Sequence, residues 1–195
     1  MGISTSRSAV IFDLDGTLTV PCLDFDAIRT EIGISGPILE AIADLDPDQR
    51  ERAQRILLRH EREAARQARL QNGAVEVVNT LRNKGYPVAI LTRNARATVD
   101  LVLDKFNLVV DAIRTREDGA IKPSAEPVLS ICGELGADPK DSWMVGDHRM
   151  DMLSGRAAGT RTVLMISDQA VPEYADQADH VIRRLSELLS IVGSP

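Results

Sequence analysis

Short apolar runs alternate along most of this chain with longer segments of helical periodicity, and this alternation restricts the possible folds more than any other feature. The apolar runs, rich in Val, Ile and Leu, cover residues 9–13, 87–91, 108–113, 142–145 and 161–166. The helical segments cover residues 74–84, 95–106, 124–135 and 150–158. Runs that are apolar throughout are typical of strands buried on both faces, and strands that alternate with helices form parallel sheets. We therefore expect a doubly wound α/β fold with helices on both faces of a parallel sheet.

One stretch interrupts the alternation. From Leu18 to Asn72 no strand pattern occurs, and the sequence carries only signals for the starts and ends of helices. Gly36-Pro37 favours one helix start, and residues 46–49 (Asp-Pro-Asp-Gln) supply an N-cap, a first-turn proline and a capping-box glutamine for another. We predict a small all-helical cap over residues 18–72, inserted after the first strand of an α/β core that comprises residues 1–17 and 73–195.

The composition is ordinary for a globular protein and argues against several classes of partner. Hydrophobic residues make up 44% of the 195 residues and charged residues 27%, which suffices for one buried core. The 23 Lys and Arg against 29 Asp and Glu leave a net charge of −6, opposite in sign to a nucleic-acid-binding surface. No apolar run approaches the roughly 18 residues that cross a bilayer. We expect a cytoplasmic monomer or homodimer with no nucleic-acid or membrane partner.

Two minor patterns bear on location. Cys22 and Cys132 form no Cys-x-x-Cys motif, which fits a reduced, intracellular setting. Met1-Gly2 followed by Ser6 matches the template for N-myristoylation, but so short a pattern often arises by chance. We do not expect lipidation at Gly2.

Polar side chains follow directly on the predicted strands, where the carboxyl ends of parallel strands meet at one edge and ligands bind. In chain order they are Asp13, Asp15, Thr17, Thr92, Asn94, Lys122, Asp147 and Asp151. Two carboxylates 4 Å apart repel each other by about 4 kcal/mol at an effective dielectric constant near 20, so such a cluster requires protonation or a hard cation. Ligands that are all oxygen atoms favour Mg²⁺, and the lysine beside them favours a phosphoryl group.

The same residues form four motifs that resemble those of the haloacid dehalogenase-like hydrolase superfamily. The first, Asp-x-Asp-Gly-Thr, spans residues 13–17, and the second is a hydroxyl residue at the end of the next strand, here Thr92. The third is a lysine before proline, Lys122-Pro123, and the fourth, Gly-Asp-x-x-x-Asp, spans residues 146–151. A helical cap between the first and second motifs is similar to the phosphoglycolate phosphatase branch of this superfamily, which also includes β-phosphoglucomutase.

The resemblance implies a division of roles. Asp13 is the expected nucleophile that forms an aspartyl-phosphate, and Asp15 is expected to protonate the leaving oxygen and then to activate water. Mg²⁺ would be held by Asp13, the backbone carbonyl of Asp15, and Asp147, with Asp151 behind them. Thr92 and Lys122 would bind the phosphate oxygens. Further contacts with the substrate are expected from Thr17, Arg93 and Asn94.

The predicted activity is hydrolysis of a small phosphorylated metabolite by a Mg²⁺-dependent phosphomonoesterase. Phosphoglycolate is only one candidate substrate, because residues 18–21 (Leu-Thr-Val-Pro) depart from the Leu-x-Asp-Ser continuation common in that branch and the cap is short. A larger phosphate ester fits as well. Two other functions stay open: a phosphomutase that returns the phosphoryl group to a sugar, and a non-catalytic phospho-switch similar to a receiver domain.

Several features have ordinary explanations. Six arginines at steps of three and four form a stripe in the predicted cap, and a solvated helix face is the favoured interpretation, with anion docking or self-association as alternatives. These are Arg52, Arg55, Arg59, Arg62, Arg66 and Arg69. Asn94 is expected either to cap the following helix or to orient the loop of Asp13. His148 is interpreted as a residue at the surface or behind the site.

Overall fold

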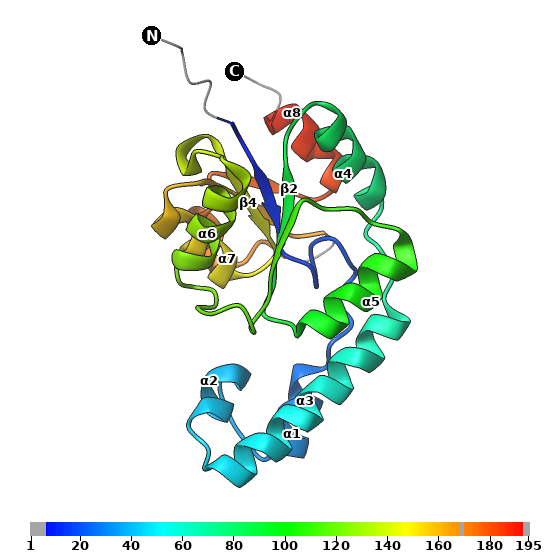
Figure 1. Ribbon diagram of the computed structural model, residues 1–195, viewed down its shortest axis with the longest axis vertical. Coiled ribbons are helices and arrows are strands. Elements are labelled where there is room, and N and C mark those ends of the chain that lie inside the picture. The colour runs from blue at the N-terminus through cyan, green and yellow to red at the C-terminus, as the bar shows by residue number, and fades with distance from the viewer. Residues whose placement is uncertain (1–6, 168–169, 193–195) are drawn as a thin grey trace.

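The five apolar runs and one further strand form a six-stranded parallel sheet with the first strand at its centre (Figure 1). The computed structural model describes residues 7–167 and 170–192, so the pattern at Gly2 lies outside the described residues. The strands are β1 (Val10–Phe12), β2 (Val88–Leu91), β3 (Ala112–Arg114), β4 (Trp143–Gly146), β5 (Arg161–Met165) and β6 (His180–Ile182). Their order is β3-β2-β1-β4-β5-β6, and every pair is parallel. The predicted α/β fold is confirmed.

Two strands differ from the sequence prediction. The third begins at Ala112 rather than near Leu108, because Asn107 takes a left-handed conformation (φ 49°) and the Leu108 amide donates to the carbonyl of Leu103 in the preceding helix. Leu108 thus closes a helix instead of starting a strand. The strand β6 was not predicted at all. It lies at the sheet edge with only Ile182 buried, so it lacks the continuous apolar pattern of the inner strands.

Helices cover both faces of the sheet, as expected for strands that are apolar throughout. On one face lie α4 (Ala74–Asn83), α5 (Arg96–Phe106) and α8 (Leu188–Val192); on the other lie α6 (Glu126–Leu135) and α7 (Arg149–Ala158). Short 3-10 helices cover residues 139–141, 173–177 and 185–187. The side chains of β1 alternate between the two cores: Val10 and Phe12 pack with α4, α5 and α8, and Ile11 packs with α6. Because β1 is buried on both faces, the polar residues that follow it are held at a defined position.

The segment between β1 and α4 is helical and lies to one side of the sheet, below it in Figure 1. It contains α1 (Phe25–Ile32), α2 (Ile38–Ala43) and α3 (Pro47–Gln67). The expected N-cap of α3 is present, since the Asp46 carboxylate accepts a hydrogen bond of 3.0 Å from the Gln49 amide. These helices share a small core of their own. The division into a core and a cap of residues 18–72 is compatible with this arrangement and stays a prediction.

The helix α3 connects the two parts. Its first half packs on the small core through Ala53 and Leu57, and its last turns reach the main core, where Ala65 is buried beside α5.

All six arginines of the predicted stripe are exposed, and three of them pair with acidic residues. These pairs are Arg55–Glu51, Arg59–Glu31 and Arg66–Glu63. The pairing supports the interpretation of a solvated face. Within the described residues, no helix is long and apolar enough to cross a membrane.

Candidate active site

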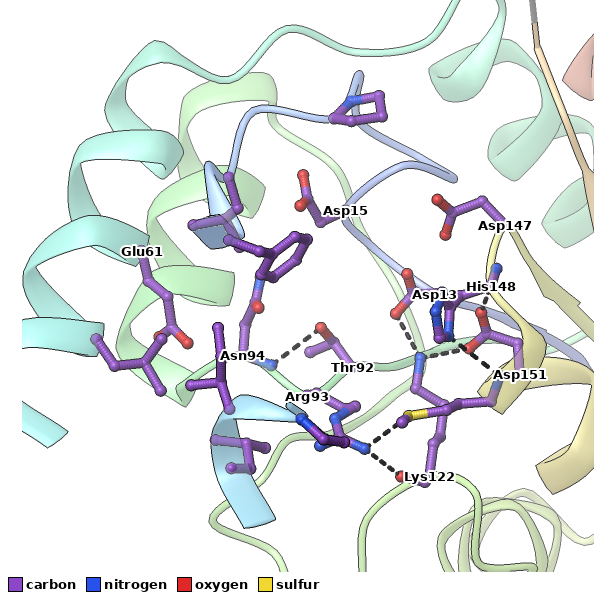
Figure 2. Close-up of a pocket in the computed structure, with 18 of the residues that line it drawn as sticks. Asp13, Asp15, Glu61, Thr92, Arg93, Asn94, Lys122, Asp147, His148 and Asp151 are labelled. Carbon is purple, nitrogen blue, oxygen red and sulfur yellow. Dashed lines mark hydrogen bonds and ion pairs between the residues drawn. The ribbon is translucent and has the colours of Figure 1, made fainter. Parts of the chain in front are cut away.

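Two strand ends, the first turn of a helix and one loop bring the predicted residues together (Figure 2). Asp13 follows β1, Asp147 follows β4, and Asp151 lies in the first turn of α7. Lys122 comes from the loop before α6; its Nζ lies 2.5 Å from Asp13 Oδ1, 2.6 Å from Asp151 Oδ1 and 2.9 Å from the carbonyl oxygen of Leu91. Side chains that are more than a hundred positions apart in the sequence thus meet at the centre of the sheet edge.

Lys122 is nearly fully buried, and its three acceptors match the three donors of an ammonium group. Burial by itself would lower the pKa of Lys122, but the negative charges of Asp13 and Asp151 outweigh it and raise this pKa above its ordinary value. The lysine therefore stays charged. Its position beside Asp13 suits an ammonium that attracts the oxygens of a group reacting there.

The acidic residues fit a hard divalent cation. Oxygen atoms of Asp13, Asp147 and Asp151 lie within 4.8 Å of one another. Burial, with smaller contributions from neighbouring carboxylates, raises the pKa of Asp13 to about 7 and that of Asp147 to about 8. When they are ionised, three carboxylates facing one ammonium leave an excess of two negative charges, which a cation such as Mg²⁺ would offset.

Hydrogen bonds distinguish the three acids. Both oxygens of Asp151 have protein donors: Lys122 Nζ on Oδ1 and the His148 amide on Oδ2, at 3.0 Å. Asp13 and Asp147 are therefore the better candidates for direct ligands, and the position of Asp151 behind them stays a prediction. The expected third ligand, the backbone carbonyl of Asp15, belongs to the loop that carries Asp13.

Two motif glycines are required by close approach of these carboxylates. A Cβ atom on Gly16 would lie 2.0 Å from Asp147 Oδ2, and Gly16 also has a positive φ of 91°. A Cβ atom on Gly146 would lie 2.2 Å from Asp151 Cγ. The glycines of the first and fourth motifs thus make room for the acidic cluster.

The chain is similar to known proteins over most of its length. Residues 26–165 match the family described as haloacid dehalogenase-like hydrolase. The chain belongs to this family. An uncharacterized hydrolase of Saccharomyces cerevisiae is 33% identical over 197 residues, covering 94% of this chain and 90% of that protein. The pyrophosphatase PpaX of Halalkalibacterium halodurans is 30% identical over 212 residues, with 95% and 97% covered. The predicted family and the prediction of a hydrolytic enzyme are confirmed.

A solved structure shows the same fold. A protein from Haemophilus somnus 129pt, described as a predicted phosphoglycolate phosphatase, superposes with a TM-score of 0.77 at 21% sequence identity, covering 96% of this chain and 99% of that one. At this identity the similarity concerns the fold alone.

The second motif of this haloacid dehalogenase-like hydrolase lies at the end of β2. Thr92 is buried, and its Oγ1 accepts a hydrogen bond of 3.2 Å from the Asn94 amide. The N-cap residue of α5 is Ala95, so the structure does not support the alternative in which Asn94 caps this helix. Thr92 and Asn94 both line the cavity in front of Asp13.

Asp15 and Thr17 have different surroundings. Asp15 lines the cavity, and burial raises its pKa to about 6. Thr17 was expected to contact the substrate, but it is fully buried and is not among the cavity-lining residues. Its Oγ1 lies 3.4 Å from Asp147 Oδ1, so it is placed to orient this carboxylate from behind.

Two other side chains line the cavity. His148 is the N-cap residue of α7, with its Nδ1 accepting from the Met150 amide at 3.2 Å. Arg93 donates to both carboxylate oxygens of Glu40 in α2, at 2.9 and 2.7 Å, and to the carbonyl oxygen of Lys122 at 2.7 Å. Arg93, for which we predict a contact with the substrate, therefore forms an ion pair that joins the sheet edge to α2.

A second ion pair, which the sequence analysis does not predict, also joins the helical segment to the sheet edge. Glu61 in α3 is buried, accepts a hydrogen bond of 3.2 Å from the Ala95 amide and forms an ion pair with Arg116. A signal was present, because Glu61 follows Leu57 by four positions and precedes Ala65 by four, which places an acid on the buried stripe of the helix. An acid at such a position requires a partner. Glu61 thereby links α3 to the loop that carries Thr92.

Proposed function

We propose that this chain is a Mg²⁺-dependent phosphomonoesterase that acts through an aspartyl-phosphate on Asp13. The observation that carries the proposal is the buried ammonium of Lys122, held between Asp13 and Asp151 with Asp147 close by. A carboxylate attacks a phosphoryl group only if the negative charges of both are offset. The ammonium of Lys122 supplies one positive charge. The acidic residues supply oxygen ligands for a metal ion, which would supply the rest.

In the first step an oxygen of Asp13 attacks the phosphorus atom, and the bond between phosphorus and the leaving oxygen breaks. Asp15 gives its proton to that leaving oxygen. Its raised pKa of about 6 supports this role, because a group that first donates and later accepts a proton works best near the ambient pH. The charge of Lys122 would attract the oxygens of the transferred phosphoryl group, and the Thr92 hydroxyl would donate a hydrogen bond to one of them.

In the second step Asp15 takes a proton from a water molecule, whose oxygen attacks the phosphorus of the aspartyl-phosphate. The bond between phosphorus and Asp13 breaks, which releases inorganic phosphate and restores the carboxylate. Asp13 and Asp147 would hold Mg²⁺ with the Asp15 carbonyl, and the bound ion would offset the negative charge of the phosphoryl oxygens.

The names of relatives support phosphoryl chemistry. One relative is named a pyrophosphatase, and a structure with the same fold is described as a predicted phosphoglycolate phosphatase. We propose a small phosphorylated metabolite as the substrate.

Hydrolysis of para-nitrophenyl phosphate tests the reaction. We expect turnover with Mg²⁺, loss of turnover on chelation, and loss in Asp13→Asn. Asp15→Asn should impair a substrate with a poor leaving group more than para-nitrophenyl phosphate, whose leaving group needs little protonation. Asp104→Asn, an exposed residue of α5, is the matched control and should keep the full rate.

The same assay distinguishes the alternatives. A phosphomutase would need a bisphosphate activator and would release little phosphate in water. A phospho-switch would take up a single phosphoryl group without turnover. Either result, or full activity of Asp13→Asn, would contradict the proposed hydrolysis.

A further inference from the structure

The cavity in front of Asp13 has two chemically different ends. It has a volume of 530 Å³ and lies between the sheet edge and the helices α1, α2 and α3. On the sheet side it is lined by the catalytic candidates described above. On the opposite side it is lined by seven apolar residues, Pro21, Leu23, Phe25, Pro37, Ile38, Leu39 and Leu57. A phosphoryl group bound at Asp13 would therefore direct its leaving group toward an apolar wall.

Phe25 is the most informative residue of this wall. It is the first residue of α1, and 49% of its surface is exposed. Of the seven large hydrophobic residues that are exposed within the described residues, Phe25 is the only one that lines this cavity. An aromatic ring left open to solvent inside a concave site is suited to contact a ligand.

The charged residues beyond the catalytic cluster have partners from the chain itself. Arg29 in α1 pairs with Asp26 at 2.6 Å, and Arg93 pairs with both oxygens of Glu40. Glu61 is engaged by Arg116. An acid of the chain already offsets the charge of each of these arginines, so a second anionic group on a substrate would gain less there than at an unpaired arginine, whereas an apolar group would displace only water.

We propose that this enzyme selects phosphate monoesters whose leaving group is apolar and uncharged, over esters of polyols or of acids and over pyrophosphate. The inference rests on the proposed phosphatase function and specifies its substrate class. The contact surface for the leaving group is the apolar wall, with Phe25 as its exposed ring. Differences of one or a few apolar groups in such a pocket change specificity by about 10- to 200-fold.

Matched pairs of esters test this selectivity. Benzyl phosphate and glucose 6-phosphate both carry a six-membered ring on a primary alcohol, so they differ mainly in the polarity of the ring. Ethyl phosphate and phosphoglycolate both have two carbons and differ by one carboxylate. We expect kcat/KM to be at least about tenfold higher for benzyl phosphate than for glucose 6-phosphate, and higher for ethyl phosphate than for phosphoglycolate.

A pair of variants assigns the selectivity to the wall. Phe25→Gln should lower the ratio of kcat/KM between benzyl phosphate and glucose 6-phosphate several-fold. Leu129→Gln, on the exposed surface of α6 and outside the cavity, should leave the ratio unchanged. Both residues are about half exposed, so neither substitution empties a core.

The outcomes separate the two proposals. If para-nitrophenyl phosphate is hydrolysed with Mg²⁺ but glucose 6-phosphate, phosphoglycolate or pyrophosphate is preferred, the selectivity is wrong and the phosphatase function stands. An unchanged ratio in Phe25→Gln would likewise overturn the role of the wall. If no ester is hydrolysed, the proposed function fails and the inference fails with it.

Discussion

The ammonium of Lys122 lies 2.5 Å from the carboxylate of Asp13, although the two residues are 109 positions apart in the sequence. The ion pair is buried, and a second carboxylate, Asp151, lies 2.6 Å from the same nitrogen. The candidate nucleophile is therefore held by a charge that water does not screen. The orientation of Asp13 and the electrostatics of the site both depend on one lysine.

Replacement of this lysine by an apolar side chain should abolish most of the activity. In Lys122→Met the three carboxylates lose their buried counter-charge, and we expect kcat for para-nitrophenyl phosphate to fall by about 10²- to 10³-fold, the usual loss for one preorganised electrostatic group. Lys84→Met, at the exposed end of α4, is the control. Near-normal turnover in Lys122→Met would exclude a role of this ammonium in the reaction.

A single methyl group should disturb the site at Gly146. In Gly146→Ala the new Cβ would meet Asp151, which must move away from Lys122 and from the His148 amide. We expect a loss of activity of at least about tenfold and a lower midpoint of thermal unfolding, because a buried contact of 2.2 Å cannot be accommodated without a shift.

Gly133→Ala provides the matched control for this substitution. Gly133 lies inside α6, and a methyl group added there would point into open space, so alanine should keep the activity and slightly stabilise the helix. Equal behaviour of the two variants in activity and melting assays would show that Asp151 does not need its observed position.

The acidic cluster should make stability depend on pH and on Mg²⁺ together. The pKa of Asp13 is raised from 3.8 to about 7 and that of Asp147 from 3.8 to about 8, so the folded protein binds these protons more tightly than the unfolded chain. Without metal, these two groups therefore favour the folded state at low pH, and this contribution is lost as the pH rises from about 4 to about 8. Bound Mg²⁺ should offset the loss, because it stabilises the ionised carboxylates.

Thermal unfolding at pH 6 and pH 8, with EDTA or with Mg²⁺, measures this linkage. The increase in Tm caused by Mg²⁺ should be larger at pH 8 than at pH 6, and in Asp147→Asn the Tm with EDTA at pH 8 should rise relative to the parent. An increase that is equal at both pH values, or that is unaffected by Asp147→Asn, would place the metal elsewhere.

The buried pair of Glu61 and Arg116 should anchor α3 to the sheet edge. Glu61→Ala leaves the Ala95 amide without its acceptor and removes the counter-charge of Arg116, which keeps only the carbonyl oxygen of Arg93 as an acceptor; we expect the free energy of unfolding to fall by about 3–5 kcal/mol in urea denaturation. The double variant Glu61→Leu/Arg116→Met should recover part of this loss, because no uncompensated charge stays buried.

The control for this pair lies two positions further along the helix. Glu63 is exposed and makes only surface contacts, so Glu63→Ala should change the free energy of unfolding by less than about 1 kcal/mol. Equal effects of Glu61→Ala and Glu63→Ala would show that the buried pair adds nothing to the attachment of α3.

Local patterns in the sequence determined the main elements of this protein. The apolar runs predicted five of the six strands because inner strands are buried on both faces, and the Asp46-Pro47 signal predicted the start of α3 because a cap is a contact between near neighbours. The spacing of Asp13, Lys122 and Asp147 relative to strand ends predicted that they would meet. Parallel strands align their carboxyl ends, so position along the strand is enough for this prediction.

Contacts between distant side chains could be decided only by the tertiary structure. The pairing of Arg93 with Glu40 and of Glu61 with Arg116 depends on how the helices between β1 and α4 pack on the sheet edge, and no local pattern encodes that packing. The burial of Thr17 behind Asp147 and the apolar wall around Phe25 have the same origin. Sequence periodicity specifies which face of an element is buried, whereas the partner of a polar group depends on the angle and distance at which two elements meet.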